Sequence, residues 1–92
     1  MPRRKSLILV IESDHTLLPM LMIAISANGY RVIGVHNIEG AYLALDEHDI
    51  DAVYSRRTMR EKFAVPLVVG ENMRGALGRL RLAVTLPRVI AS

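Results

Sequence analysis

Aliphatic runs alternate along the chain with segments whose apolar residues recur every three or four positions. Unbroken aliphatic runs are typical of parallel strands buried on both faces, and the longer spacing is typical of amphipathic helices. The expected strands cover residues 7–11, 30–35, 52–55, 65–69 and, more weakly, 84–90. The expected helices cover residues 15–27, 38–47 and about 73–80. This alternation predicts an α/β fold, with a parallel sheet of four or five strands flanked by helices.

Polar residues and prolines mark the ends of these elements. Asp14 or Ser13 is expected to cap the first helix, and Asn37 the second, because their side chains accept hydrogen bonds from free amides. Residues 56–64 are polar and basic and too few for a helix with two turns, so we expect a loop. Pro66 indicates that the fourth strand lies at a sheet edge or starts there.

The composition fits one small domain over residues 1–92 with an aliphatic core, since 51% of residues are hydrophobic and 4% aromatic. Cysteine is absent, which excludes disulfides, thiolate nucleophiles and cysteine-based metal sites. The basic N-terminus precedes an apolar run of five residues that Glu12 interrupts, so neither a signal peptide nor a membrane span is expected. These features predict a soluble, cytoplasmic protein.

Charge is divided unequally along the chain. Residues 6–55 hold seven acids against one arginine, a net charge of −6. Residues 56–92 hold seven arginines and one lysine against two acids, a net charge of +6. Opposite fields on one small domain favour self-complementary association or a polar partner surface. Ordinary scattered surface charge is the alternative.

Four segments in this order resemble a response-regulator receiver domain over residues 6–55. They are Leu7-Ile-Leu-Val-Ile-Glu-Ser-Asp14, Asn28-Gly-Tyr-Arg-Val32, Asn37-Ile-Glu-Gly-Ala41 and Asp51-Ala-Val53. The resemblance implies a flavodoxin-like sheet with strand order 2-1-3-4-5 and a crevice at the carboxyl ends of strands 1 and 3. After residue 55 the likeness decays. We expect the third helix to be shortened to a loop and the final helix to be missing.

The residues that carry receiver chemistry are replaced in this chain. Receivers hold Mg²⁺ with an acidic pair after the first strand; Glu12 matches the first acid, Ser13 replaces the second, and Asp14 is the expected helix cap. Arg56 stands where the phosphate-accepting aspartate would be, and a guanidinium cannot be that nucleophile. The later hydroxyl and lysine positions are also unmatched. The sequence therefore predicts a degenerate receiver without phosphotransfer, metal or cofactor.

An ion pair is the structural hypothesis for this region. Arg56 at the end of the third strand would face Glu12 or Asp14 at the end of the first, which would fix one conformation. The alternative is that Arg56 points into solvent from a loop.

The first helix predicts a homodimer that uses this helix or the exposed sheet edge, because the apolar residues of the helix cover nearly its whole circumference. The expected interface residues are Leu17, Leu18, Leu21, Met22 and Ile25. The alternative is two or three exposed aliphatic side chains, which many surfaces carry.

Cations of the C-terminal half are candidates for binding phosphate or a partner protein. They are Arg56, Arg57, Arg60, Lys62, Arg74, Arg79 and Arg81. Nucleic acid is possible as a ligand, but no aromatic residue interleaves these cations and no nucleic-acid-binding motif is visible.

The remaining chemistry argues against an enzyme. His15, His36 and His48 match no metal-site spacing, and no catalytic serine arrangement or phosphate-binding glycine loop is visible. A receiver that uses Asp51 or Ser55 as acceptor is disfavoured, since Asp51 begins its strand. The sequence thus predicts a phosphorylation-independent protein-interaction module of bacterial signalling, dimeric and with an unidentified protein partner. Its expected contact surface combines the first helix, the basic loop at 56–62 and the helix at about 73–80. A small nucleic-acid-binding regulator is the second hypothesis.

Overall fold

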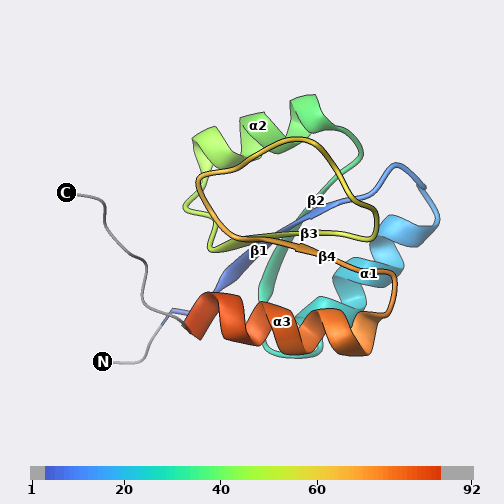
Figure 1. Ribbon diagram of the computed structural model, residues 1–92, viewed down its shortest axis with the longest axis vertical. Coiled ribbons are helices and arrows are strands. Elements are labelled where there is room, and N and C mark those ends of the chain that lie inside the picture. The colour runs from blue at the N-terminus through green and yellow to red at the C-terminus, as the bar shows by residue number, and fades with distance from the viewer. Residues whose placement is uncertain (1–3, 86–92) are drawn as a thin grey trace.

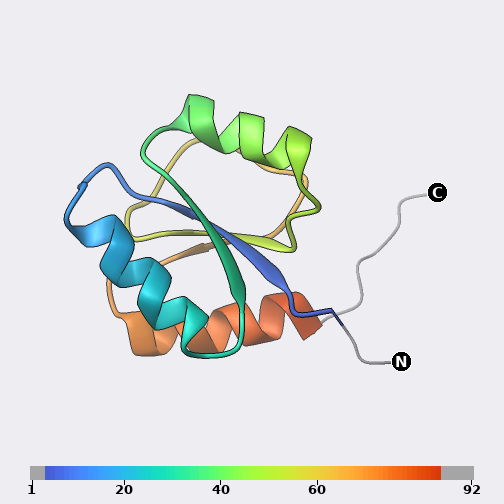
Figure 2. The same ribbon diagram turned by 180° about the vertical axis from the view of Figure 1, so that it is seen from behind.

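A computed structural model describes residues 4–85 of the chain. Its elements are β1 (Leu7–Ile11), α1 (Leu17–Ser26), β2 (Arg31–Val35), α2 (Ile38–Glu47), β3 (Ala52–Ser55), β4 (Leu67–Val69) and α3 (Met73–Thr85). The sheet forms the middle layer, with α2 on one side and α1 and α3 on the other (Figure 1). The same three layers are seen from behind in Figure 2. No helix in this part of the chain is long and apolar enough to cross a membrane.

The sheet is parallel, with strand order β2-β1-β3-β4. Leu9 of β1 lies opposite Ile33 of β2 and Val53 of β3, which places β1 and β3 at the centre. This is the flavodoxin-like order up to its fourth strand, as predicted. Pro66 directly precedes β4, which is an edge strand of the sheet formed by residues 4–85, so the missing N–H of Pro66 costs no bond to a further strand there.

Strand side chains alternate between two hydrophobic clusters, one on each face of the sheet. The face under α1 and α3 gathers Ile8, Val10, Ala52, Tyr54 and Val68 from the strands. The opposite face, under α2, gathers Leu7, Leu9, Ile11 and Val53. Every residue of β1 and β3 is buried, which is why both strands read as unbroken aliphatic or near-aliphatic runs.

Side-chain caps begin the first two helices as the sequence predicts. Asn37 Oδ1 accepts a hydrogen bond from the Gly40 N–H at 2.8 Å at the start of α2. Asp14 Oδ1 accepts from Thr16 N–H at 2.8 Å and Leu17 N–H at 3.0 Å, just ahead of α1. Local capping therefore fixes both helix starts, because these amides have no partner inside the helix.

Gly34 allows α1 to lie close to β2. A Cβ atom on this glycine would collide with Met22 Sδ and would lie 3.0 Å from Leu18 Cδ1. The sequence suggests only that Gly34 weakens the strand. In the structure the missing side chain makes room for two side chains of the helix.

The second half of the chain departs from expectation at its end. Segment 56–64 is a loop without a helix, as predicted, and it continues to residue 66, because the strand expected at 65–69 begins only at Leu67. The helix expected at about 73–80 is present and longer: α3 packs Ala76 and Leu80 into the cluster that also holds α1. Whether a further helix follows a fifth strand concerns residues outside the described part. The expected strand at 84–90 is wrong at its start, since Val84 and Thr85 belong to α3, and residues 86–90 lie outside the described part.

Candidate functional site

The candidate site lies at the carboxyl ends of β1 and β3, the two central strands. Val10 pairs with Tyr54 in the register of these strands, so the residues two positions further on, Glu12 and Arg56, lie side by side. Both side chains lie on the α1 and α3 side, because Val10 and Tyr54 point there. In open α/β sheets this position, where the strand order reverses, is the usual ligand crevice.

An ion pair fills this crevice. Arg56 Nε donates to Glu12 Oε1 at 2.8 Å, with side-chain exposures of 21% for Arg56 and 6% for Glu12. The second carboxylate oxygen, Oε2, accepts from the backbone N–H of Asp14 at 2.9 Å. The predicted ion pair is confirmed with Glu12, whereas Asp14 bonds to the amides that begin α1.

The contacts of Glu12 change its acidity in opposite directions. Burial alone would raise the pKa of Glu12, but the hydrogen bonds from Arg56 and from the Asp14 N–H outweigh it. The pKa of Glu12 is therefore lowered from its ordinary value of 4.5. The hydrogen bond to Glu12 in turn raises the pKa of Arg56. The pair is charged at neutral pH and favours the conformation in which the two strand ends are joined.

The other polar residues near the crevice are engaged or face away from it. Ser55 Oγ donates to Arg57 O at 2.8 Å and accepts from the Arg57 N–H at 3.2 Å. Asp51 lies at the opposite end of β3 and accepts from the Leu7 N–H at 2.8 Å. Ser13 is exposed. Asp51 and Ser55, the two residues considered as substitute phosphate acceptors, are therefore both bound to backbone groups, and they do not share one site.

A cation such as Mg²⁺ would find poor ligands in this crevice. Both oxygens of Glu12 already accept hydrogen bonds, and the Arg56 guanidinium lies beside them. Hard cations need several free oxygen ligands, and a fixed positive charge repels them. Among the described residues, no group of three acids or histidines could hold a metal ion.

Two contacts near the crevice were not predicted. Tyr54 is fully buried and its hydroxyl donates to Gly70 O at 2.7 Å, tying β3 to the end of β4. Burial raises the pKa of Tyr54. His15 and His36, which the sequence separates by twenty residues, stack with ring centroids 3.9 Å apart. Only the fold could reveal this pair, since each histidine follows a different strand.

The first helix does not place its predicted interface residues on the surface. Leu18, Leu21 and Ile25 are buried in the core of this same chain, and Leu17 and Met22 pack against that core. They recur at the spacing of one helix face, so a single face suffices to bury them. The side chains left outside are Met20 at 61% exposure and Ile23 at 69%. Leu18, Leu21 and Ile25 are therefore wrong as interface residues, Leu17 and Met22 are partly exposed, and the alternative of a few exposed aliphatics fits this helix.

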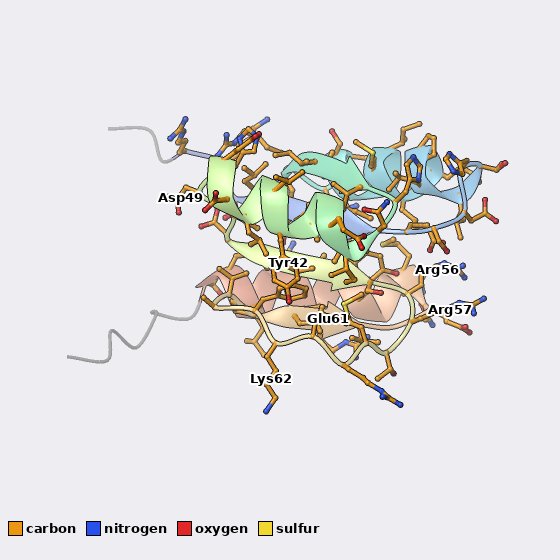
Figure 3. All side chains as sticks on the ribbon, turned by 90° about the horizontal axis from the view of Figure 1, so that it is seen from above. Tyr42, Asp49, Arg56, Arg57, Glu61 and Lys62 are labelled. Carbon is orange, nitrogen blue, oxygen red and sulfur yellow. The ribbon has the colours of Figure 1, made fainter. Side chains whose placement is uncertain are left out.

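The predicted cations do not form one surface. Arg56 and Arg57 lie at the carboxyl end of the sheet, while Lys62 extends from the loop (Figure 3). That loop packs on the α2 face, whereas the helix with Arg74, Arg79 and Arg81 packs on the other face. The expected single surface of first helix, basic loop and last helix is therefore interrupted by the sheet.

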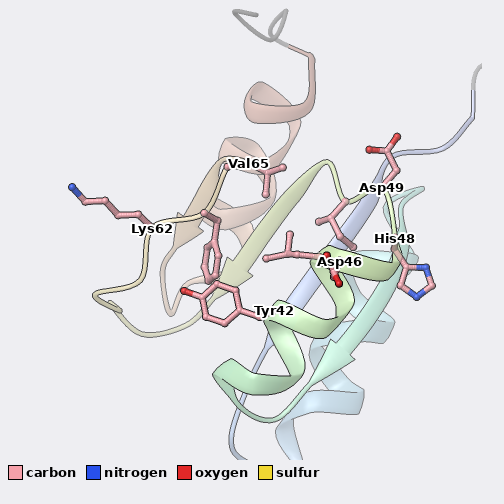
Figure 4. Close-up of a pocket in the computed structure, with 10 residues that line it drawn as sticks. Tyr42, Asp46, His48, Asp49, Lys62 and Val65 are labelled. Atoms are coloured by element: carbon pink, nitrogen blue, oxygen red, sulfur yellow. The ribbon is translucent and has the colours of Figure 1, made fainter. Parts of the chain in front are cut away.

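A pocket lies on the α2 face, where the loop takes the place of a crossover helix. Its volume is about 380 Å³. It is lined by Tyr42, Leu45, Asp46, His48, Asp49, Ile50, Lys62, Phe63, Ala64 and Val65 (Figure 4). The sequence does not predict this pocket, because neither α2 nor the loop is unusual by itself.

Two solved structures similar to this fold are response regulators. A response regulator from Thermotoga maritima superimposes with a TM-score of 0.66 at 13% identity, over 90% of this chain and 100% of that chain. An orphan response regulator of H. pylori gives a TM-score of 0.65 at 13% identity, over 90% of this chain and 99% of that one. No family model and no curated protein matches the sequence. The chain therefore has a receiver-like, flavodoxin-type fold, at an identity that establishes the fold alone.

Proposed function

We propose that this chain is a pseudo-receiver: a domain with the receiver fold that acts through protein–protein contacts in signalling or regulation, without phosphorylation. The observation that carries the proposal is the ion pair of Arg56 and Glu12 at the carboxyl ends of the central strands. A receiver changes conformation when a phosphoryl group and a cation enter this crevice. In this chain a fixed internal cation lies there instead.

The geometry supports a constant conformation as the basis of that role. The guanidinium supplies a permanent positive charge to a buried carboxylate, and Arg56 remains charged across the physiological pH range. No covalent step is needed to keep the two strand ends joined. The partner of such a domain would recognise one state, and its binding would depend on the amount of the protein rather than on its modification.

Exposed apolar side chains support a protein partner. They are Met20, Ile23, Tyr42, Leu43 and Leu82. They lie on all three helices, so more than one face of the molecule offers contact area. Large exposed apolar groups of this kind are favoured at protein interfaces when they gather into patches.

The test combines a phosphodonor with two arginine variants. Incubation with acetyl phosphate and Mg²⁺ should leave the intact mass of the protein unchanged. Arg56→Ala should lower the melting temperature, because the buried Glu12 carboxylate loses its partner, whereas Arg57→Ala, an exposed neighbour, should not. Addition of 80 Da to the wild-type chain, or equal melting temperatures for both variants, would contradict the proposal.

A small nucleic-acid-binding regulator is the second candidate, favoured by the exposed Arg57, Arg60 and Lys62 of the loop. Binding that depends on phosphate contacts weakens steeply with salt, whereas an apolar protein contact persists. A tagged chain should therefore retain a discrete protein from lysate after nuclease treatment. Recovery of nucleic acid, with every protein lost on digestion, would favour the second candidate.

A further inference from the structure

The two sides of this molecule carry opposite charges on their helices. Helix α2 contains Glu39, Asp46 and Glu47 and no lysine or arginine, and Asp49 follows it. Helix α3 contains Arg74, Arg79 and Arg81 and no acid. The two helices pack against opposite faces of the same sheet. The two helices thus differ in charge, α2 being acidic and α3 basic, while the loop beside α2 carries the exposed cations Arg60 and Lys62.

The pocket lies between the acidic helix α2 and the loop. Apolar side chains form its interior, among them Phe63, whose ring lies 5.8 Å from that of Tyr42 in a tilted arrangement. Asp46 and Asp49 lie along its border with α2, and both are exposed. Lys62 also lines it, but its side chain extends away from the pocket (Figure 4). Such a pocket fits an apolar side chain that is flanked by cations.

The exposed side of α3 has this chemistry. Arg74, Gly78 and Arg81 recur at the spacing of one helix face, and Leu82 lies beside them with 59% of its surface exposed. A Cβ atom on Gly78 would meet nothing within 4 Å, so another surface can approach the helix closely at this point. The face therefore presents one large aliphatic side chain between arginines.

We propose that α3 of one molecule docks against the pocket of a second copy, with Leu82 entering between α2 and the loop and Arg81 facing Asp46 and Asp49. The loop leaves this space because residues 56–66 cross from β3 to β4 without the helix that parallel connections usually contain. A helix from another copy supplies that missing cover. The inference deepens the proposed interaction role by naming its partner.

A second copy of the chain is the occupant of the pocket whose charges are complementary to those of Asp46 and Asp49. The other exposed apolar pair, Met20 and Ile23, lies on α1, and that helix contains no charged residue. Among the helices in residues 4–85, only α3 combines an exposed aliphatic residue with cations and no acid. Because α3 and the pocket lie on opposite faces of the sheet, the contact is head-to-tail. Each molecule offers both surfaces, but one partner molecule can occupy only one of them.

This geometry can be tested by mixing two variants in sedimentation velocity experiments. Asp46→Arg with Asp49→Arg disables the pocket and leaves α3 intact, whereas Leu82→Glu disables α3 and leaves the pocket intact. Each variant alone should sediment as a monomer at concentrations where the wild-type chain self-associates. Mixed together they should form a 1:1 dimer and nothing larger, because one intact contact remains.

Leu43→Glu is the matched control, since Leu43 is as exposed as Leu82, at 62%, lies on α2 and does not line the pocket. It should associate like the wild type. Arg81→Glu serves if Leu82→Glu does not fold, which circular dichroism would reveal. Wild-type association should also weaken at high salt.

Three outcomes would overturn the inference: a wild-type chain that is monomeric at all accessible concentrations, an equal loss of association in Leu43→Glu, or variants that remain monomeric when mixed. None of them bears on phosphorylation. The phosphodonor and Arg56 experiments decide that part of the proposed function independently.

Discussion

The two faces of the sheet are covered in different ways. On one face α1 and α3 bury Leu21, Ile25 and Leu80 against the strands. On the other face a single helix, α2, shares the task with the loop that carries Met59 and Phe63. The first face is closed by regular helices, whereas the second retains an open pocket. An irregular segment can cover a sheet with apolar side chains, but it packs them less completely than a helix does.

The largest loss of unfolding free energy should come from truncating a buried side chain on the face that α1 and α3 cover. Leu80 has no exposed surface, so Leu80→Ala should cost about 3 kcal/mol of unfolding free energy. Phe63 in the loop is only partly buried, so Phe63→Ala should cost about 1–2 kcal/mol. Urea denaturation of both variants measures the difference. Equal costs would show that the loop packs as tightly as the helix.

A second pair of variants compares crowded and open glycines on the face that α1 and α3 cover. Gly34→Ala should cost about 2 kcal/mol, because the new methyl group meets Met22 and Leu18. Gly75 lies on α3 with nothing within 4 Å of a Cβ atom, so Gly75→Ala should stabilise the protein by up to about 1 kcal/mol. Thermal unfolding checks both signs. A neutral Gly34→Ala would mean that α1 can move away from β2.

The smallest effect concerns the strand ends, where the pair of Glu12 and Arg56 joins β1 to β3. A carboxyl whose pKa is lower in the folded protein than in the unfolded chain stabilises the protein at pH values above the unfolded-state pKa, here 4.5. That contribution is lost as the pH falls through the folded-state pKa. Wild-type stability should therefore decline as the pH falls below about 4.5 and through the lower folded-state pKa of Glu12.

Glu12→Gln is the variant that isolates this contribution. It should be less stable than the wild type at pH 7, and the difference should shrink in acid as the wild-type carboxyl becomes protonated. Asp14, whose pKa is lowered by the hydrogen bonds from the Leu17 and Thr16 amides, is retained in both proteins and contributes equally to their acid unfolding. A difference that is constant with pH would mean that the contacts of Glu12 do not depend on its charge.

The agreement between sequence and structure is closest where local signals act alone. The bounds of β1, β3 and α2 follow from aliphatic runs and from the Asn37 cap, which need no distant contact. The ion pair was also predictable, because the ends of adjacent central strands must meet. The first helix was misjudged because its composition alone cannot tell which side faces the sheet, and the last because Val84 reads equally well as strand or helix.

The sequence by itself determined that this protein would be an α/β domain with a receiver-like order of elements and an arginine in place of the phosphate acceptor. Only the tertiary structure decided which side chains meet. It turned Leu18, Leu21 and Ile25 inward, put the basic loop and α3 on opposite faces, and opened a pocket beside Phe63. The reason is physical: backbone preferences and hydrophobic spacing act over a few neighbours, whereas a face, a pocket or a charge arrangement exists only when distant segments pack together.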